Sequence, residues 1–256
     1  MNTKSATPHR RATKKRKKKN GFKKFWCLGR EEVNTGQFDI TSEGTLSVRE
    51  GNYQYNIHSI VKKYGTPTEI FFPTIVENRV RDLIDTFNAF IKVVGYRGKF
   101  YYHYPMKVNQ NREFVLPTVA EGANLEVASA NELYLVKRMI EQERFHSRIR
   151  VICNGPKTEK YIQLIEELRG KGLAVIPIIE DMVEFERMKK FKGPVGIRVD
   201  LNVKVKGHWD KKYNRFGFTE QEVIDLGKIK NLTVLHYHIS SQVEHMTSLV
   251  QLVKRA

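Results

Sequence analysis

The sequence predicts an α/β fold built on a parallel β-sheet, and two regular patterns support this prediction. From residue 66 onward, short apolar segments of strand length alternate with amphipathic segments of helix length. Most of the helical segments begin at a residue that favours a helix N-terminus. A helix that links two strands brings the chain back to a parallel neighbour, so the alternation indicates a parallel sheet with helices on its faces. Doubly wound sheets and closed (β/α) barrels share this pattern, and periodicity alone leaves both open.

Six segments are predicted to be the strands of this sheet. They are Phe100–Met106, Leu125–Ala128, Arg148–Cys153, Ala174–Glu180, Pro194–Asp200 and Thr233–Ile239. No Gly-x-Gly-x-x-Gly follows the first strand, which disfavours a dinucleotide-binding sheet. Six strands are also two fewer than the eight that close a barrel of this unit.

The helices between these strands carry capping signals. An oxygen acceptor stands three residues before a glutamate in Ser129/Glu132, Asp181/Glu184 and Thr219/Glu222, and Thr158 caps a further helix without an acidic partner. A long helix before the first strand is predicted to begin at Pro73 and Thr74, with Glu77 completing a capping box. Its apolar stripe consists of Val76, Val80, Leu83, Ile84, Phe87 and Ile91.

The chain is predicted to consist of three regions: a tail, an entry segment and the α/β domain. Residues 1–24 are expected to be a disordered basic tail, because this stretch has no apolar face to bury and repels itself. Residues 25–65 form an entry segment, with brief strands at Phe38–Ile40 and Thr45–Val48 and a short helix at Ile57–Tyr64 that ends at Gly65. Residues 66–256 form the α/β domain.

The net charge of +17 belongs mainly to the N-terminal end. Residues 1–30 hold 12 Lys or Arg and no acid, so the rest of the chain has 45 − 12 = 33 bases against 28 acids, or +5. The tail is therefore a candidate polyanion-binding arm, with a merely solvated tail as the alternative.

No apolar run approaches the ~20 residues that span a bilayer, and a cytoplasmic location is expected. Cys27 and Cys153 are too few and too far apart for a disulfide framework or a metal cluster, and Cys153 is expected to be a small buried hydrophobe.

Lys107 is the first candidate functional residue, because it ends an aromatic strand. A partly desolvated lysine is a suitable amine for covalent attachment of an aldehyde, although a lysine that simply enters water at the end of a strand is the common alternative. In (β/α) barrels, functional side chains lie at the carboxyl ends of strands. These positions here are Lys107, Glu126, Asn154, Glu180, Arg198 and His238, with Ser240 and Ser241 after it.

Seven motifs in order resemble the biosynthetic arginine decarboxylases, which are fold-type III pyridoxal-phosphate enzymes. They are Tyr104–Gln110, Leu125–Ser129 with Glu132-Leu133, Ile152–Lys157, Gly196–Val199, Gly207–Trp209, Arg215–Phe218 and Leu235–Gln242. The resemblance runs from about Thr66 to the end of the chain. It implies an incomplete TIM-like barrel of the alanine racemase type, with about six of eight strands and without the family's C-terminal β domain.

The resemblance also implies roles for individual residues. Lys107 would hold the aldehyde of pyridoxal phosphate and is a candidate proton shuttle, His238 would stack on its ring, and Ser241 would help to hold the phosphate. Glu126 and Arg198 resemble the charged pair that borders the cofactor, with a structural ion pair as the alternative. Ser240 and Ala128 stand where family members commonly have glycine, which would narrow the phosphate site. Mg²⁺ is a further cofactor that the resemblance alone would allow.

By the same resemblance, the substrate is L-arginine, converted to agmatine and CO₂ for polyamine and spermidine synthesis. A complete form is expected to be a homo-oligomer. The family's later glycine-rich loop and acidic partner for the pyridine nitrogen have no counterpart here, so the chain alone is expected to be inactive. The alternatives are ornithine or diaminopimelate decarboxylase, or a truncated non-catalytic relative that acts as a binding protein.

Overall fold

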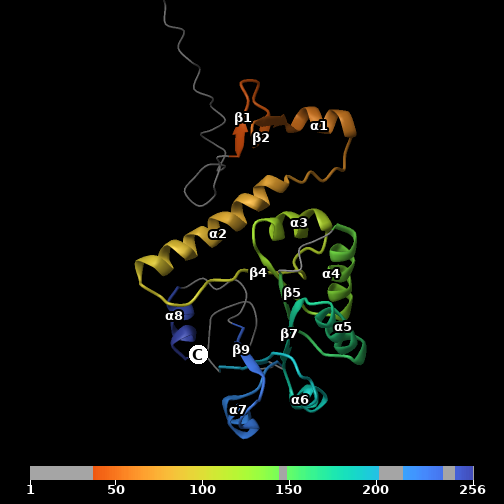
Figure 1. The fold of residues 1–256 in the computed structure, drawn as a ribbon. Coiled ribbons are helices and arrows are strands. Elements are labelled where there is room, and N and C mark those ends of the chain that lie inside the picture. Colours follow the sequence, from red (N-terminus) through yellow and green to blue (C-terminus); the bar gives the residue numbers. More distant parts are fainter. Residues whose placement is uncertain (1–36, 144–148, 202–215, 239–245, 256) are drawn as a thin grey trace, which may run out of the picture. The chain divides into compact units, whose positions relative to one another are not determined.

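The computed structural model describes residues 37–143, 149–201, 216–238 and 246–255, and it contains two compact units (Figure 1). The first unit comprises Met1–Ile75 and the second comprises Val76–Ala256. The predicted basic tail lies outside the described residues. The predicted region boundaries at residues 24 and 65 stay predictions.

The first unit contains a three-stranded antiparallel sheet followed by a short helix. Its strands are β1 (Phe38–Ile40), β2 (Leu46–Glu50) and β3 (Tyr53–Asn56), in the order β1-β2-β3. The helix α1 (Ile57–Tyr64) begins where the side chain of Asn56 accepts the amide of Ser59 and ends at Gly65, as predicted. The third strand was not predicted, although the aromatic and polar residues of its Tyr-Gln-Tyr-Asn sequence alternate as they do in strands.

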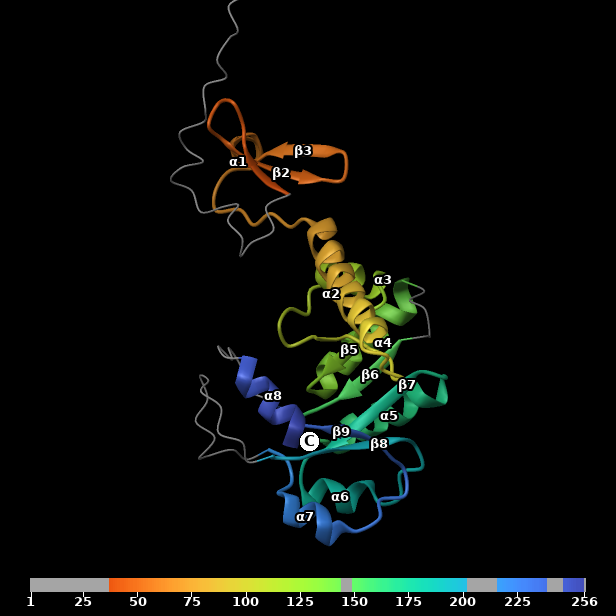
Figure 2. The ribbon, with the colours of Figure 1, turned by 90° about the vertical axis from the view of Figure 1, so that its left-hand side faces the viewer.

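The second unit contains a six-stranded sheet in which all neighbouring strands are parallel and follow chain order, which confirms the predicted fold class. Its strands are β4 (His103–Pro105), β5 (Asn124–Val127), β6 (Arg150–Cys153), β7 (Ala174–Ile179), β8 (Val195–Arg198) and β9 (Leu232–His236). Figure 2 shows β5, β6 and β7 following one another, with β8 and β9 beyond them. Each lies at a predicted position, and most are shorter than predicted.

Helices α3 to α7 connect successive strands of the sheet, and α8 follows the last strand. They are α3 (Arg112–Ala120), α4 (Ala130–Glu143), α5 (Glu159–Gly170), α6 (Met182–Met188), α7 (Glu220–Leu226) and α8 (Met246–Arg255). The predicted caps of α5, α6 and α7 are confirmed, because the side chains of Thr158, Asp181 and Thr219 accept hydrogen bonds from backbone amides three residues later. Helices α3 and α8 were not predicted. No helix of the described residues is long and apolar enough to cross a membrane.

The helix α2 (Pro73–Val93) begins one residue earlier than its predicted cap allows. Pro73 is the first helical residue, so Thr74 lies inside the helix and the predicted Thr74/Glu77 capping box is wrong. Proline suits the first helical position because it lacks an N–H, and the amide of Thr74 instead donates to the Glu50 carboxylate at 3.2 Å. The predicted apolar stripe is buried only in part: Val80 is buried, whereas Phe87 is 45% exposed and stacks on Phe100.

The core of the second unit lies between the sheet and helices α4 and α5. Alternate residues of β5 and β6 face it, so that Leu125, Val127, Val151 and Cys153 are fully buried. The strand β7 is buried along nearly its whole length, which is typical of a central parallel strand covered on both faces. Cys153 is a buried hydrophobe as predicted, and burial raises the pKa of its thiol to about 12. The rigid centre of the sheet therefore supports the carboxyl ends of β5 to β7.

Candidate active site

Lys107 lies in a tight turn directly after β4. The preceding residue, Met106, is fully buried, and its amide donates to the carbonyl of Glu126 on β5 at 2.9 Å. The amide of Val108 closes the turn on the carbonyl of Pro105 at 3.1 Å. Lys107 itself is exposed. The turn therefore presents an accessible amine at the carboxyl edge of the sheet, on a backbone anchored to β5.

Glu126 is a half-buried carboxylate at this edge. Its Oε1 accepts a hydrogen bond from Nδ2 of Asn154, which follows β6, at 2.7 Å. Burial raises the pKa of Glu126, and the bond from Asn154 and the charge of Lys107 oppose that rise. The charge of Lys107 therefore acts on Glu126, as expected for side chains at one edge of the sheet.

Arg198 ends β8 and contacts Glu180 and Phe216 among the residues that the structure describes. Its guanidinium lies 3.4 Å from Oε2 of Glu180 and packs over the ring of Phe216 at 4.9 Å. The other carboxylate oxygen of Glu180 accepts the amide of Gly155 at 2.8 Å. Glu180 thus holds Arg198, and Asn154 holds Glu126. This arrangement differs from the direct Glu126–Arg198 ion pair that was the alternative expectation.

His236 is a site residue that the sequence did not single out. It ends β9, directly opposite Arg198 in the sheet register. Burial lowers its pKa to about 4, and the charges of Arg198, His238 and Lys107 act in the same direction, so the imidazole is neutral at pH 7. Its Nδ1 is buried and has no hydrogen-bond partner among the residues that the structure describes. His238, two positions later, is exposed, whereas Ser240 and Ser241 lie outside the described residues.

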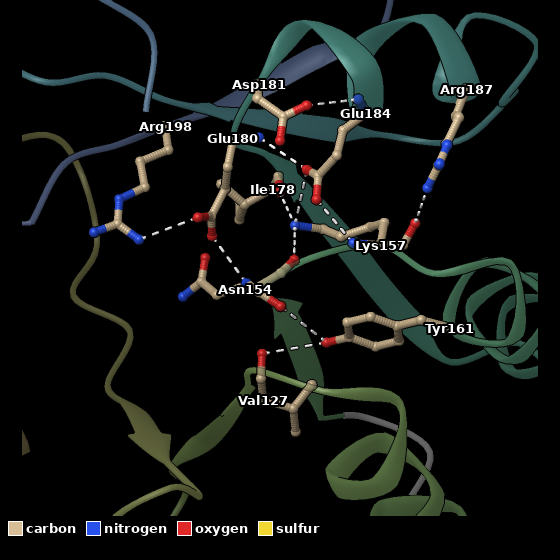
Figure 3. A network of polar contacts seen from close by, with 11 residues as sticks. Val127, Asn154, Lys157, Tyr161, Ile178, Glu180, Asp181, Glu184, Arg187 and Arg198 are labelled. Carbon is tan, nitrogen blue, oxygen red and sulfur yellow. Dashed lines mark hydrogen bonds and ion pairs between the residues drawn. The ribbon is translucent and has the colours of Figure 1, made fainter. Parts of the chain in front are cut away.

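A buried ionic network lies beneath this edge (Figure 3). The ammonium of Lys157 is 3.4 Å from Oε2 of Glu184 and donates to the carbonyls of Gly155 and Ile178. Burial lowers the pKa of Lys157, and the charges of Glu184 and Glu180 oppose that effect. Sequence reasoning missed this lysine, because a charged side chain next to a capping threonine is normally solvated. The position of Lys157 inside the family-like motif Ile152–Lys157 is the sequence feature that could have identified it.

The hydroxyl of Tyr161 supports the same loop from α5. It lies 3.3 Å from the carbonyl oxygens of Val127 and Asn154, and both bonds are drawn in Figure 3. Burial raises the pKa of this phenol, so it remains a hydrogen-bond donor. The last residue of β5 and the first residue after β6 are therefore joined by a fully buried aromatic side chain.

The candidate site contains an amine, a carboxylate, a guanidinium and a neutral imidazole. These groups lie at the carboxyl edge of a parallel βα sheet, which is where enzymes with such folds carry their active sites. The family model described as "Pyridoxal-dependent decarboxylase, pyridoxal binding domain" matches residues 80–256. The chain belongs to this family.

Known proteins agree with this assignment. A biosynthetic arginine decarboxylase of Rhodopirellula baltica is 27% identical over 251 residues, covering 86% of this chain and 36% of that protein. The crystal structure of the biosynthetic arginine decarboxylase SpeA from Campylobacter jejuni matches with a TM-score of 0.68 and 26% identity over 84% of this chain and 37% of that one. Diaminopimelate decarboxylase from M. jannaschii, at 20% identity and a TM-score of 0.65, covers 86% of this chain and 51% of that one and shares the fold. The chain therefore spans little more than a third of the length of the arginine decarboxylases it matches.

The described residues fit pyridoxal phosphate in two respects. The accessible amine of Lys107 suits its aldehyde, and Arg198 and Lys107 supply positive charge for an anionic ligand. Two buried polar atoms at this edge, Oδ1 of Asn154 and Nδ1 of His236, lack partners in the described part of the chain. Buried polar groups normally have partners, so these atoms favour a polar ligand there.

No group of three or more His, Cys, Asp or Glu among the described residues could hold a metal ion, and the Mg²⁺ that the resemblance allowed has no support.

Proposed function

We propose that this chain binds pyridoxal phosphate at the carboxyl edge of its sheet, with Lys107 as the point of attachment, and serves an enzyme that decarboxylates L-arginine to agmatine. The observation that carries the cofactor site is the position of Lys107. It is an exposed amine directly after β4, and its charge acts on both Glu126 and His236. When bound, pyridoxal phosphate supplies an electron-poor ring that takes up the electron pair left by a departing carboxylate.

Each residue of the edge has a proposed task. Lys107 holds the cofactor and, when released, carries a proton at its Nζ. His238 packs on the cofactor ring and Ser241 contacts the phosphate, as the family resemblance implies. Glu126, fixed by Asn154, and Arg198, fixed by Glu180, border the cofactor with opposite charges.

The choice of L-arginine as substrate is supported by the names of the relatives, because the matched proteins include arginine decarboxylases from bacteria and rice. A role in polyamine and spermidine synthesis and a cytoplasmic location follow from that choice as further predictions. Homo-oligomerisation of a complete form is a prediction of the same kind. Comparing CO₂ release from L-arginine, L-ornithine and meso-diaminopimelate by a full-length protein that contains this domain would test the substrate.

The cofactor site is tested by reductive trapping. The full chain is incubated with pyridoxal phosphate and reduced with borohydride, and the labelled peptide is identified by mass spectrometry. We expect one label, on the peptide that contains Lys107. Lys107→Ala should remove the label without changing the helix content, whereas Lys171→Ala, which replaces an exposed ion-paired lysine, should leave it in place. Label spread over the basic tail would contradict the proposal.

A further inference from the structure

The buried lysine of the second unit is placed to organise the candidate site from below. Lys157 is fully buried, and its ammonium faces three acceptors: the carboxylate of Glu184 and the carbonyls of Gly155 and Ile178. An ammonium has three donors, so the described contacts satisfy all of them. A buried charge without such partners is strongly unfavourable, and this arrangement therefore depends on the positions of all three acceptors.

These contacts lie where the backbone pairing of β6 and β7 ends. The last paired residues of the two strands are Cys153 and Pro177, and Pro177 has no N–H to donate. Beyond that point, the Lys157 ammonium bridges the carbonyl of Gly155, on the β6 side, and the carbonyl of Ile178, on the β7 side. The side chain thus connects the two strand ends in place of a backbone hydrogen bond.

Glu184 makes the same connection from α6. Its Oε1 accepts the amide of Lys157 at 2.8 Å, and its Oε2 accepts the amide of Glu180 at 2.9 Å. The Glu184 amide is in turn held by the side chain of Asp181 at 2.8 Å. One buried carboxylate therefore fixes both the loop after β6 and the first residue after β7.

Glu180 links the buried network to Gly155 and Arg198 at the edge of the sheet. Its backbone is fixed by Glu184, and its carboxylate holds the amide of Gly155 at 2.8 Å and the guanidinium of Arg198 at 3.4 Å. Figure 3 shows this line of contacts from Lys157 through Glu184 and Glu180 to Arg198. We propose that Lys157 is a positioning residue, which sets Glu180 and thereby Arg198 at the site where pyridoxal phosphate binds. The cofactor arm of this inference rests on the proposed function.

The test compares two variants of the full chain that lose stability for different reasons. Lys157→Met removes the charge and keeps an unbranched side chain of similar length. Val136→Ala truncates a fully buried residue of α4 outside the network and serves as the control for a general loss of stability. Affinity for pyridoxal phosphate is measured by absorbance titration below the melting temperature of every variant. If Lys157→Met does not fold, Lys157→Gln, which also removes the charge, replaces it.

We expect Lys157→Met to weaken cofactor affinity by about ten- to a hundredfold relative to Val136→Ala at a comparable melting temperature, because small displacements of a site are costly. Glu180→Gln should weaken affinity as well, and the double variant Lys157→Met/Glu180→Gln should lose less than the product of the two single effects, because the lysine acts through Glu180. Equal affinities in Lys157→Met and Val136→Ala, or fully multiplicative effects in the double variant, would overturn the proposal.

Hydrogen exchange provides a readout that needs no cofactor. The amides of Gly155 and Glu180 are held by the side chains of Glu180 and Glu184, so they should exchange at least about tenfold faster in Lys157→Met than in Val136→Ala. Unchanged exchange at both amides would refute the positioning role even if the cofactor binds. If the unmodified chain binds no pyridoxal phosphate, the proposed function fails, and faster exchange at these two amides would still support the role of Lys157 in the fold.

Discussion

Arg198 and His236 lie opposite each other at the carboxyl ends of β8 and β9, and the arginine faces a histidine that burial keeps neutral. The folded state holds the pKa of His236 at about 4, below the ordinary value of about 6.5. Between these two values the unfolded chain binds more protons than the folded chain, so stability is lost as the pH falls through this window.

We therefore predict that His236 destabilises the fold by about 2–3 kcal/mol when the pH is lowered from 7 to 4. Chemical denaturation of the chain and of His236→Gln across this range would measure the difference. The pH dependence of stability should be shallower in the variant. Glu126 acts with the opposite sign because its pKa is raised, so the difference between the two proteins is the informative quantity. An imidazole NMR titration of His236 with a midpoint above pH 6 would contradict the prediction.

Asn154 is predicted to limit the rise in the pKa of Glu126 that burial causes. Asn154→Ala removes the 2.7 Å hydrogen bond, which should raise the pKa of Glu126 further and cost about 1–2 kcal/mol of stability. Carboxyl carbon NMR would follow the titration of Glu126, and denaturation would give the stability. Asn78→Ala on α2, where the asparagine accepts a bond from an exposed arginine, is the control and should change neither quantity. An unchanged Glu126 titration in Asn154→Ala would refute this role.

Gly155 is predicted to tolerate no side chain. Its φ is +72°, and a Cβ there would collide with the carbonyl oxygen of Ala128. Gly155→Ala should therefore destabilise the fold by about 3 kcal/mol or more, since backbone strain and a steric clash act together. Gly172→Ala is a matched control, because its φ of +89° is also positive but nothing lies within 4 Å of its Cβ position. That variant should cost only about 1–2 kcal/mol. Equal melting temperatures for the two variants would exclude a steric role for Ala128.

The basic tail is predicted to be dispensable for the cofactor site, in accord with a proposed boundary after residue 24. A chain that begins at Gly36 should bind pyridoxal phosphate with the affinity of the full chain. A polyanion such as heparin should bind the full chain and not the shortened chain. The affinity of the full chain for the polyanion should fall steeply with added salt, because it depends on counterion release. Lower cofactor affinity in the shortened chain would show that the boundary is misplaced.

The parallel sheet could be predicted because its strands and caps are local signals. Apolar runs of strand length and the acceptors Thr158, Asp181 and Thr219 act within a few residues of themselves, and the structure confirms them. The cap at Thr74 failed for a non-local reason: Glu50, 24 positions earlier, supplies the acceptor. Local patterns therefore gave the order of the elements but not their exact ends.

Part of the candidate site could be predicted for the same reason. The carboxyl ends of the strands indicated Lys107, Glu126 and Arg198 as candidates, because these ends meet at one edge in any parallel sheet, and the roles of the three residues stay predictions. The partners of these residues could not be inferred. Lys157 resembles a surface lysine in sequence, and its acceptors Ile178 and Glu184 lie 21 and 27 positions away. Burial of a charge depends on such distant contacts, which no local pattern encodes.

The all-parallel pairing of β4 to β9 also bears on how the chain reaches its native state. Each strand must find a partner across an intervening helix, as His103 does with Asn124 and Val195 with Leu232. Contacts between positions so far apart form late, because the intervening loop must first be closed at an entropic cost. Folding of this unit should therefore be slow for its size and leave apolar strands exposed to self-association in the meantime, so that yield from expression should rise at low temperature and with added chaperone.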